Sequence, residues 1–159
     1  MEPIRIVWGS ATGPTTMASY DAALADAGVH NYNLVPVSSM MPAGAEVDRV
    51  GTAPEKELGP VGGKLLVVEA RATSAEPGHV SAGLAWAQSP DGGLFYEAAG
   101  DTDAADIEAR VAAGIAHGQT LREWEFGPVE TKVETKQVES GTYSTAVVLA
   151  VYGSSESML

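Results

Sequence analysis

The stretch from Asn31 to Pro42 reads NYNLVPVSSMMP. Its first part, Asn31 to Val37, contains β-branched and other apolar residues and predicts a strand. Pro42 ends regular structure, because a proline donates no backbone hydrogen bond and restricts the residue before it. The chain therefore breaks strand register where Ser38-Ser39-Met40-Met41 runs into Pro42.

On both sides of this stretch, strands outnumber helices. Helical spacing of apolar residues predicts a helix from Met17 to Ala27, stopped by Gly28, and a second helix that Thr102 caps and that continues to about Arg122. Strands are predicted over residues 4–8, 31–37, 47–50, 64–72, 78–88, 93–98, 129–135 and 142–152. Loops are predicted over residues 9–16 and most of 43–63, and a frayed end over the last six residues.

The strands cluster along the chain and do not strictly alternate with the two helices. This order favours an α+β fold built from layers over a doubly wound parallel sheet. A length of 159 residues is close to that of one average domain. We therefore expect a single domain over residues 1–159.

The charge balance excludes one class of function. The chain has 21 acidic and 9 basic residues, for a net charge of −12. A nucleic-acid binder that neutralises phosphates needs clustered lysine and arginine, which this chain lacks. The acidic surplus instead favours a cationic small-molecule substrate and is typical of a protein adapted to a salt-rich cytoplasm.

The absence of cysteine and of apolar spans narrows the class further. Without cysteine, the chain has no disulfide, no thiolate nucleophile and no cysteine-based metal site. No apolar run approaches the ~18 residues of a membrane helix, and the first residues lack a signal-peptide pattern. We therefore expect a soluble, cytoplasmic protein without a membrane partner.

Familiar catalytic and metal-binding motifs are absent. The run from Gly59 to Lys64 resembles a phosphate loop, but Leu58 and Leu65 occupy positions where that motif requires glycine and serine or threonine. The three histidines show none of the spacings that place two metal ligands on one face, so no metal site is expected. No G-x-S-x-G turn exposes a nucleophilic serine.

The serine pair has two interpretations. Serines at the end of a strand ordinarily form a simple turn. At a strained turn, however, the Ser39 hydroxyl can attack the preceding peptide carbonyl to give an ester, and β-elimination with loss of ammonia then leaves a pyruvoyl group. Such a self-made carbonyl is the electrophile that a cysteine-free enzyme acting on an amino acid would need.

A resemblance that spans nearly the whole chain distinguishes these interpretations. It is carried by Gly9-Ser10, Asp21-x-Ala-Leu24, Ala27-Gly28-Val29-x-Asn31-x-Asn33-Leu34-Val35-x-Val37-Ser38-Ser39-Met40-Met41-Pro42, Ala45-Glu46-Val47, Glu76-Pro77-Gly78, Gly93-Leu94-Phe95-Tyr96-Glu97 and Trp124-Glu125. In order and spacing, these motifs resemble those of the pyruvoyl-dependent arginine decarboxylase family. The most specific of them is the core N-L-x-x-x-S-S-x-x-P.

The resemblance implies a fold and a processing step. The fold would be a β-sandwich flanked by helices, in αββα layers. Self-cleavage between Ser38 and Ser39 would give a β chain of residues 1–38 and an α chain of residues 39–159 that begins with a pyruvoyl group made from Ser39. The family assembles as trimers of such αβ units, with active sites at subunit interfaces.

The resemblance also assigns roles to residues. Glu97 matches the proton donor, Asn33 matches the residue that hydrogen-bonds the pyruvoyl group or its precursor, and Asp21 matches the residue that receives the substrate's guanidinium. The remaining matched positions line the substrate or cofactor, and they are Met17, His30, Tyr32 and Met40. His30 and Tyr32 replace smaller residues of the family, a departure that bears on the substrate more than on the reaction.

The implied activity is the decarboxylation of L-arginine to agmatine and CO₂ for polyamine biosynthesis. Two alternatives stay open at this point. One is decarboxylation of another amino acid, although Asp21 favours a cationic side chain. The other is an unprocessed binding protein of the same fold, because fold alone does not fix function.

Overall fold

The computed structural model describes all residues 1–159 and contains two α-helices and nine strands, which confirms the α+β class. The elements are β1 (Ile4–Gly13), α1 (Thr16–Ala27), β2 (Asn33–Pro36), β3 (Met40–Met41), β4 (Val47–Gly51), the 3₁₀ turn η1 (Glu55–Glu57), β5 (Lys64–Ser74), β6 (Gly78–Ser89), β7 (Gly92–Gly100), α2 (Ala104–Thr120), β8 (Glu130–Val138) and β9 (Tyr143–Glu156).

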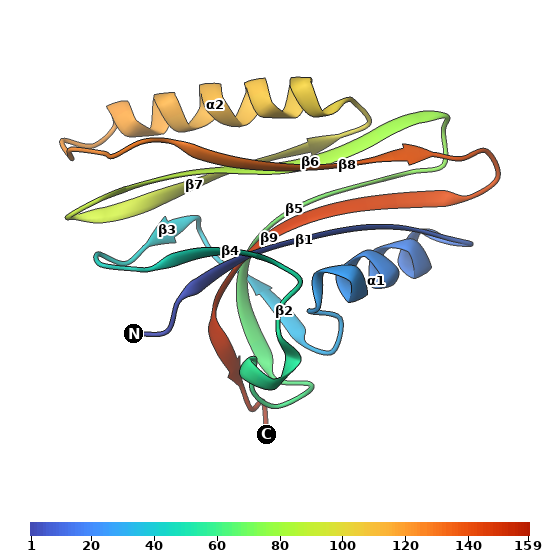
Figure 1. Cartoon of the computed structure of the whole chain (residues 1–159), viewed down its shortest axis with the longest axis horizontal. Coiled ribbons are helices and arrows are strands. Elements are labelled where there is room, and N and C mark those ends of the chain that lie inside the picture. The colour runs from blue at the N-terminus through green and yellow to red at the C-terminus, as the bar shows by residue number, and fades with distance from the viewer.

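The strands form two stacked sheets (Figure 1). The first sheet has the order β2-β5-β9-β1-β4, in which β2 runs parallel to β5 and β4 runs parallel to β1. The second sheet has the order β3-β7-β6-β8 and is antiparallel throughout. The chain crosses from the first sheet to the second between β2 and β3, at the serine pair.

Three apolar clusters hold four layers together. The largest lies between the two sheets and includes Trp86 and Phe95, whose ring centroids are 6.2 Å apart. A second cluster packs α1 against the first sheet, and a third packs α2 against the second sheet through Ile107, Val111 and Ile115. The resulting α/β/β/α order matches the expected layers.

Strand β9 contributes to two of these clusters because it is buried on both faces. Val147, Leu149 and Val151 face α1, whereas Ala146 and the other residues of the opposite parity face the second sheet. The side chains alternate because successive residues of a strand point to opposite sides. Small alanines on the inner face let the two sheets approach closely.

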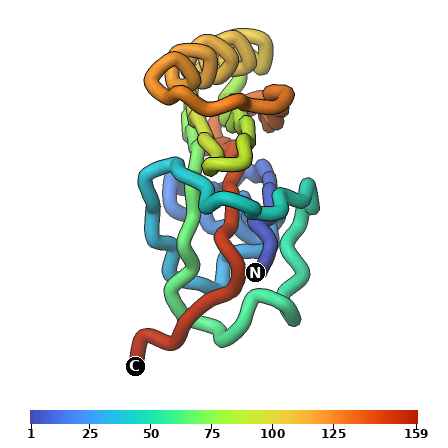
Figure 2. The backbone as a smooth tube through the Cα atoms, turned by 90° about the vertical axis from the view of Figure 1, so that its left-hand side faces the viewer, coloured from blue at the N-terminus to red at the C-terminus, as the bar shows by residue number.

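Figure 2 shows the layers from the side, with α2 at the top and both chain ends below it. Neither helix is long and apolar enough to cross a membrane.

The expected boundaries of β1 and β9 show the largest departures, and the two-residue strand β3 was not expected. A loop was expected from Gly9 onward, but β1 continues through Gly9 to Gly13. A Cβ at Gly9 would lie 2.9 Å from the backbone nitrogen of Ala27, so this glycine permits the close approach of α1. The chain end also departs from expectation, since Ser154 to Glu156 extend β9.

The N-cap of the second helix differs as well. The Asp103 side chain, and not that of Thr102, accepts a hydrogen bond from the Asp106 backbone N–H at 2.9 Å. Both residue types cap helices well, so the local sequence did not distinguish them.

We predict that Gly83→Ala destabilises the packing of α2. A Cβ at Gly83 would lie 2.8 Å from Ile107 Cγ2 and 3.0 Å from Val133 Cγ2, within a packed layer. Overpacking of this kind costs about 1–3 kcal/mol and would lower the midpoint of thermal unfolding. Gly100→Ala is the matched control, because a Cβ there meets nothing closer than 3.8 Å. Equal midpoints for the two variants would contradict the prediction.

Candidate active site

The serine pair is anchored to a different sheet on each side. The Val37 N–H donates to the Val67 carbonyl oxygen in the first sheet at 2.9 Å, and the Ser39 carbonyl oxygen accepts from the Phe95 N–H in the second sheet at 2.9 Å. Two residues therefore span the gap between sheets, which leaves the backbone little freedom.

Strain at Ser39 accompanies this crossover. Ser39 has φ 57°, and it is the one non-glycine residue in the chain with positive φ. A residue with a Cβ rarely adopts this conformation, so the flanking contacts must hold it there. Besides the Phe95 bond, the Tyr152 hydroxyl donates to the Met40 carbonyl oxygen at 2.7 Å.

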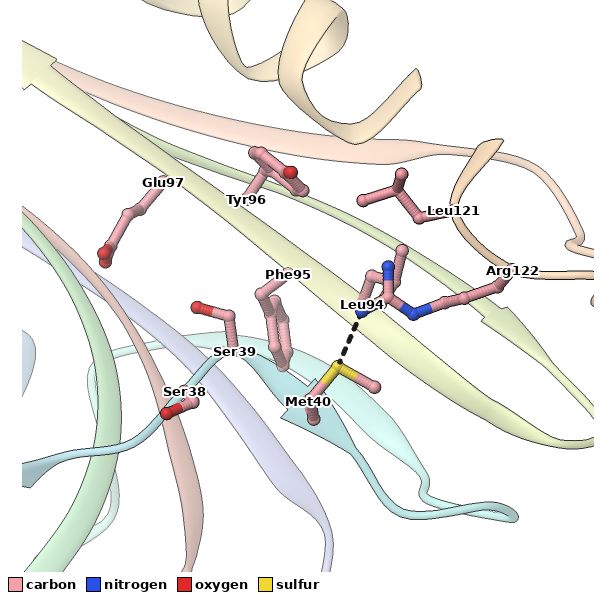
Figure 3. Close-up of a pocket in the computed structure, with 9 residues that line it drawn as sticks. All are labelled: Ser38, Ser39, Met40, Leu94, Phe95, Tyr96, Glu97, Leu121 and Arg122. Carbon is pink, nitrogen blue, oxygen red and sulfur yellow. Dashed lines mark hydrogen bonds between the residues drawn. The ribbon is translucent and has the colours of Figure 1, made fainter. Parts of the chain in front are cut away.

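A pocket of about 370 Å³ opens beside the strained serine. Its lining residues come from the crossover, from β7 and from the end of α2, and they are Ser38, Ser39, Met40, Leu94, Phe95, Tyr96, Glu97, Leu121 and Arg122. The Ser39 hydroxyl and the Glu97 carboxyl extend to the same side of the Phe95 ring (Figure 3). A serine with a strained backbone and a carboxyl group therefore share one cavity.

The electrostatic surroundings favour the protonated form of Glu97. Partial burial raises the pKa of Glu97 above its ordinary value, and the negative charge of Glu69 on β5 raises that pKa further. A carboxyl group with a raised pKa is suited to donate a proton near neutral pH.

Glu69 is itself held in place by α1. The Tyr20 hydroxyl donates to Glu69 Oε2 at 2.7 Å, and the Arg71 guanidinium carbon lies 4.5 Å from the centroid of the Tyr20 ring. Burial, followed by the bond to Glu69, raises the pKa of Tyr20 to about 12, so its hydroxyl remains a donor at neutral pH. A chain of contacts thus joins α1 to the neighbourhood of Glu97.

Other residues that the sequence proposed for the site lie outside this pocket. Met17 and Asp21 line a separate pocket of about 460 Å³ on α1, together with Ala18, Tyr20 and Leu24. Within one chain, therefore, the structure brings Ser38, Ser39, Met40 and Glu97 together but leaves Met17 and Asp21 apart from them.

The remaining proposed residues lie at the turn before β2 and at its start. His30 is exposed, and the Tyr32 hydroxyl donates to the Gly59 carbonyl oxygen at 3.4 Å. The Asn33 amide donates to the Gly62 carbonyl oxygen at 2.8 Å. None of these three residues lines the Ser39 pocket.

Sequence reasoning missed several residues near Ser39. Tyr96, Leu121 and Arg122 line the pocket, and Glu69 acts on it electrostatically. Arg122 carried one available signal, since it is one of only nine basic residues and stands at the expected end of a helix. Glu69 carried none, because its proximity to Glu97 depends on how two sheets stack.

The fold and the pocket define a class of protein: a helix-flanked β-sandwich with a strained serine, Ser39, and a carboxyl group at the junction of its sheets. The sequence profile described as "Pyruvoyl-dependent arginine decarboxylase (PvlArgDC)" matches residues 3–157. The chain therefore belongs to the pyruvoyl-dependent arginine decarboxylase family.

Individual relatives agree with this assignment. A pyruvoyl-dependent arginine decarboxylase of Halobacterium salinarum is 53% identical over 158 residues, which cover 98% of this chain and 97% of that protein. Enzymes of the same name from Thermococcus kodakarensis and Methanocaldococcus jannaschii are 32% and 30% identical, and cover 94% and 86% of this chain and 94% and 81% of their own lengths.

We predict that Glu69→Gln lowers the pKa of Glu97. The substitution removes one of the two causes that raise this pKa and leaves burial in place, so the value should fall but stay above that of an exposed glutamate. NMR titration of protein with isotopically labelled glutamate measures the pKa of Glu97, and the Glu97→Gln variant assigns the resonance of the Glu97 carboxyl group. Tyr20→Phe is the control, since it retains the Glu69 charge; a pKa of Glu97 unchanged in Glu69→Gln would refute the coupling.

Proposed function

We propose that this protein cleaves itself between Ser38 and Ser39 and then decarboxylates L-arginine to agmatine and CO₂, a reaction of polyamine biosynthesis. The observation that carries the proposal is the positive φ of Ser39 beside a pocket that also holds Glu97. Membership in the pyruvoyl-dependent arginine decarboxylase family supports it.

Cleavage begins with the Ser39 hydroxyl, which attacks the carbonyl carbon of Ser38. The strained backbone favours this step, because converting the peptide to an ester relieves the conformation that Ser39 occupies. β-Elimination of the ester then releases the Ser38 carboxylate, which ends the β chain of residues 1–38, and leaves a dehydroalanine at the start of the α chain of residues 39–159. This enamine tautomerises to an imine, takes up water and loses ammonia to give the pyruvoyl group. The residues present fit the pyruvoyl group that results, since Ser39 lies at a cavity large enough for a small ligand.

When formed, the pyruvoyl group supplies a carbonyl that accepts electrons released as CO₂ leaves the substrate. Glu97 donates the proton that replaces CO₂ on the substrate's α-carbon, a task for which its raised pKa suits it. Asp21 binds the guanidinium of arginine, because a carboxylate offers that planar cation two matched acceptors. Asn33 hydrogen-bonds the pyruvoyl group or its precursor, and Met40 lines the site beside Ser39.

We propose further that the active site joins two subunits of a trimer of αβ units. Asp21, Met17, His30, Tyr32 and Asn33 lie outside the Ser39 pocket of their own chain, so a neighbouring subunit would bring them to it. Exposed apolar side chains at both pockets support such an interface. Met17 is 70% exposed, Leu121 66% and Met40 40%.

A cytoplasmic location fits this proposal, because the cysteine-free chain needs no oxidising compartment.

Intact-mass spectrometry under denaturing conditions tests the cleavage. We expect fragments that correspond to residues 1–38 and 39–159, the larger one carrying a blocked end that borohydride reduces. Ser39→Ala should remain a single chain, because it lacks the attacking hydroxyl. A single uncut wild-type chain would overturn the proposal.

Turnover of arginine, ornithine, lysine and aspartate by the cleaved protein then identifies the substrate, and we expect arginine to be preferred.

Mixing two inactive variants tests the shared site. We expect Glu97→Gln and Asp21→Asn each to lose most activity, the first through kcat and the second through a higher KM for arginine. If each site uses Glu97 of one subunit and Asp21 of the next, equal co-expression restores roughly one quarter of the sites by random assembly. No recovery, with sedimentation showing mixed oligomers, would place both residues in one subunit.

A further inference from the structure

Arg122 occupies an unusual position for a basic side chain in this protein. It follows α2, which ends at Thr120, and it lines the pocket of Ser39 and Glu97 (Figure 3). One guanidinium nitrogen donates to the Gly118 carbonyl oxygen at 2.9 Å. Another donates weakly to Met40 Sδ at 3.6 Å. These contacts fix the guanidinium at the edge of the cavity.

The guanidinium has no carboxylate partner, although the chain carries 21 acidic residues. The ion pairs in the structure are Arg5 with Glu57, Lys64 with Glu156 and Arg110 with Asp106. Arginine has five N–H donors, and the two hydrogen bonds of Arg122 leave most of them unused. The remaining contact of the guanidinium is with the Trp124 ring, whose centroid lies 5.8 Å from the guanidinium carbon and takes no N–H donor. A half-buried, unpaired guanidinium in a pocket is a site for an anionic group.

The pocket has one ionisable group near each end. Glu97 lies toward Ser39 and Arg122 lies at the opposite end, with Leu94 and Phe95 of β7 between them (Figure 3). The raised pKa of Glu97 favours its neutral form, so this group adds little negative charge to the pocket, whereas Arg122 repels a cation and attracts a carboxylate. A ligand that carries both charges is therefore oriented with its carboxylate toward Arg122.

We propose that Arg122 binds the α-carboxylate of the amino-acid substrate through charge-assisted hydrogen bonds. This inference rests on the proposed function, which supplies a substrate with that carboxylate and removes it as CO₂. Because the negative charge disappears in the reaction, Arg122 favours the substrate over its decarboxylated product. The residue is thus a determinant of substrate binding and of product release, and its loss should raise KM more than it lowers kcat.

A pair of matched ligands tests the carboxylate contact in the wild-type enzyme. Desaminoarginine and its amide both carry the guanidinium, lack the amine that reacts with the keto group, and differ only in the charge of the carboxyl position. We expect the acid to inhibit about 10- to 100-fold more tightly than the amide, as for a charge-assisted hydrogen bond. Equal inhibition constants would overturn the proposal whatever any variant does.

Arg122→Gln tests whether this residue is responsible. We expect the ratio of the two inhibition constants to fall close to one and KM for arginine to rise by a similar factor, while inhibition by agmatine stays unchanged. Arg110→Gln is the matched control, because Arg110 lies on α2 and pairs with Asp106 outside the pocket. A wild-type ratio in Arg122→Gln would overturn the assignment.

Cleavage of each variant is checked by intact mass, because Arg122 contacts Met40 next to the cut. If Arg122→Gln is not cleaved, Arg122→Lys takes its place. Lysine keeps the charge but loses the planar pair of donors, so the ratio of the inhibition constants of the amide and the acid should drop several-fold. A ratio equal to that of the wild-type enzyme would count against the proposal. A wild-type protein that cleaves itself but does not turn over arginine would refute the proposed function. The turnover assay separates this result from a failure of the Arg122 proposal, which the inhibition constants measure.

Discussion

The candidate site depends on the way in which the backbone on either side of the serine pair is fixed to both sheets at once. Val37 is tied to Val67 in one sheet and Ser39 to Phe95 in the other, at 2.9 Å in each case. The separation of the stacked sheets is set by the packed side chains between them, so it cannot adjust to relax two residues. The strain at Ser39 is therefore maintained by the whole sandwich core, far beyond the turn itself.

The pocket arises where both sheets lose a neighbouring strand. β2 pairs with β5 only as far as Val67, and β3 pairs with β7 only at Gly93 and Leu94. Beyond these points, the edges of β5 and β7 are free, and they carry Glu69 and Glu97. Two free edges are a liability for aggregation unless something covers them, and an assembly that buries them would serve both stability and function.

The spacing of apolar residues and the positions of glycine and proline predicted most helices and strands of this fold, because both kinds of element leave local sequence patterns. The strand after Gly9 was missed because a glycine that admits a neighbouring helix looks, in sequence, like one that ends a strand. The serine pair and Glu97 were reached through resemblance, since neither has a distinctive local pattern. The sequence marked Arg122 only as a scarce basic residue at the expected end of a helix and did not mark Glu69 at all, because the relation of both residues to Glu97 is created by contacts between segments far apart in the chain.

The position of β1 has a consequence for a protein cut after Ser38. The 10 residues of β1 lie inside the first sheet, between β9 and β4, and form an antiparallel ladder with β9 from Ile4–Tyr152 to Gly13–Tyr143. Through β1, the small fragment would thus contribute an internal strand to its partner's sheet, and it could not leave without dismantling that sheet. Folding must then precede cutting. Once denatured, the two pieces would have to find each other in solution, so a unimolecular reaction would become a bimolecular one and recovery would depend on concentration.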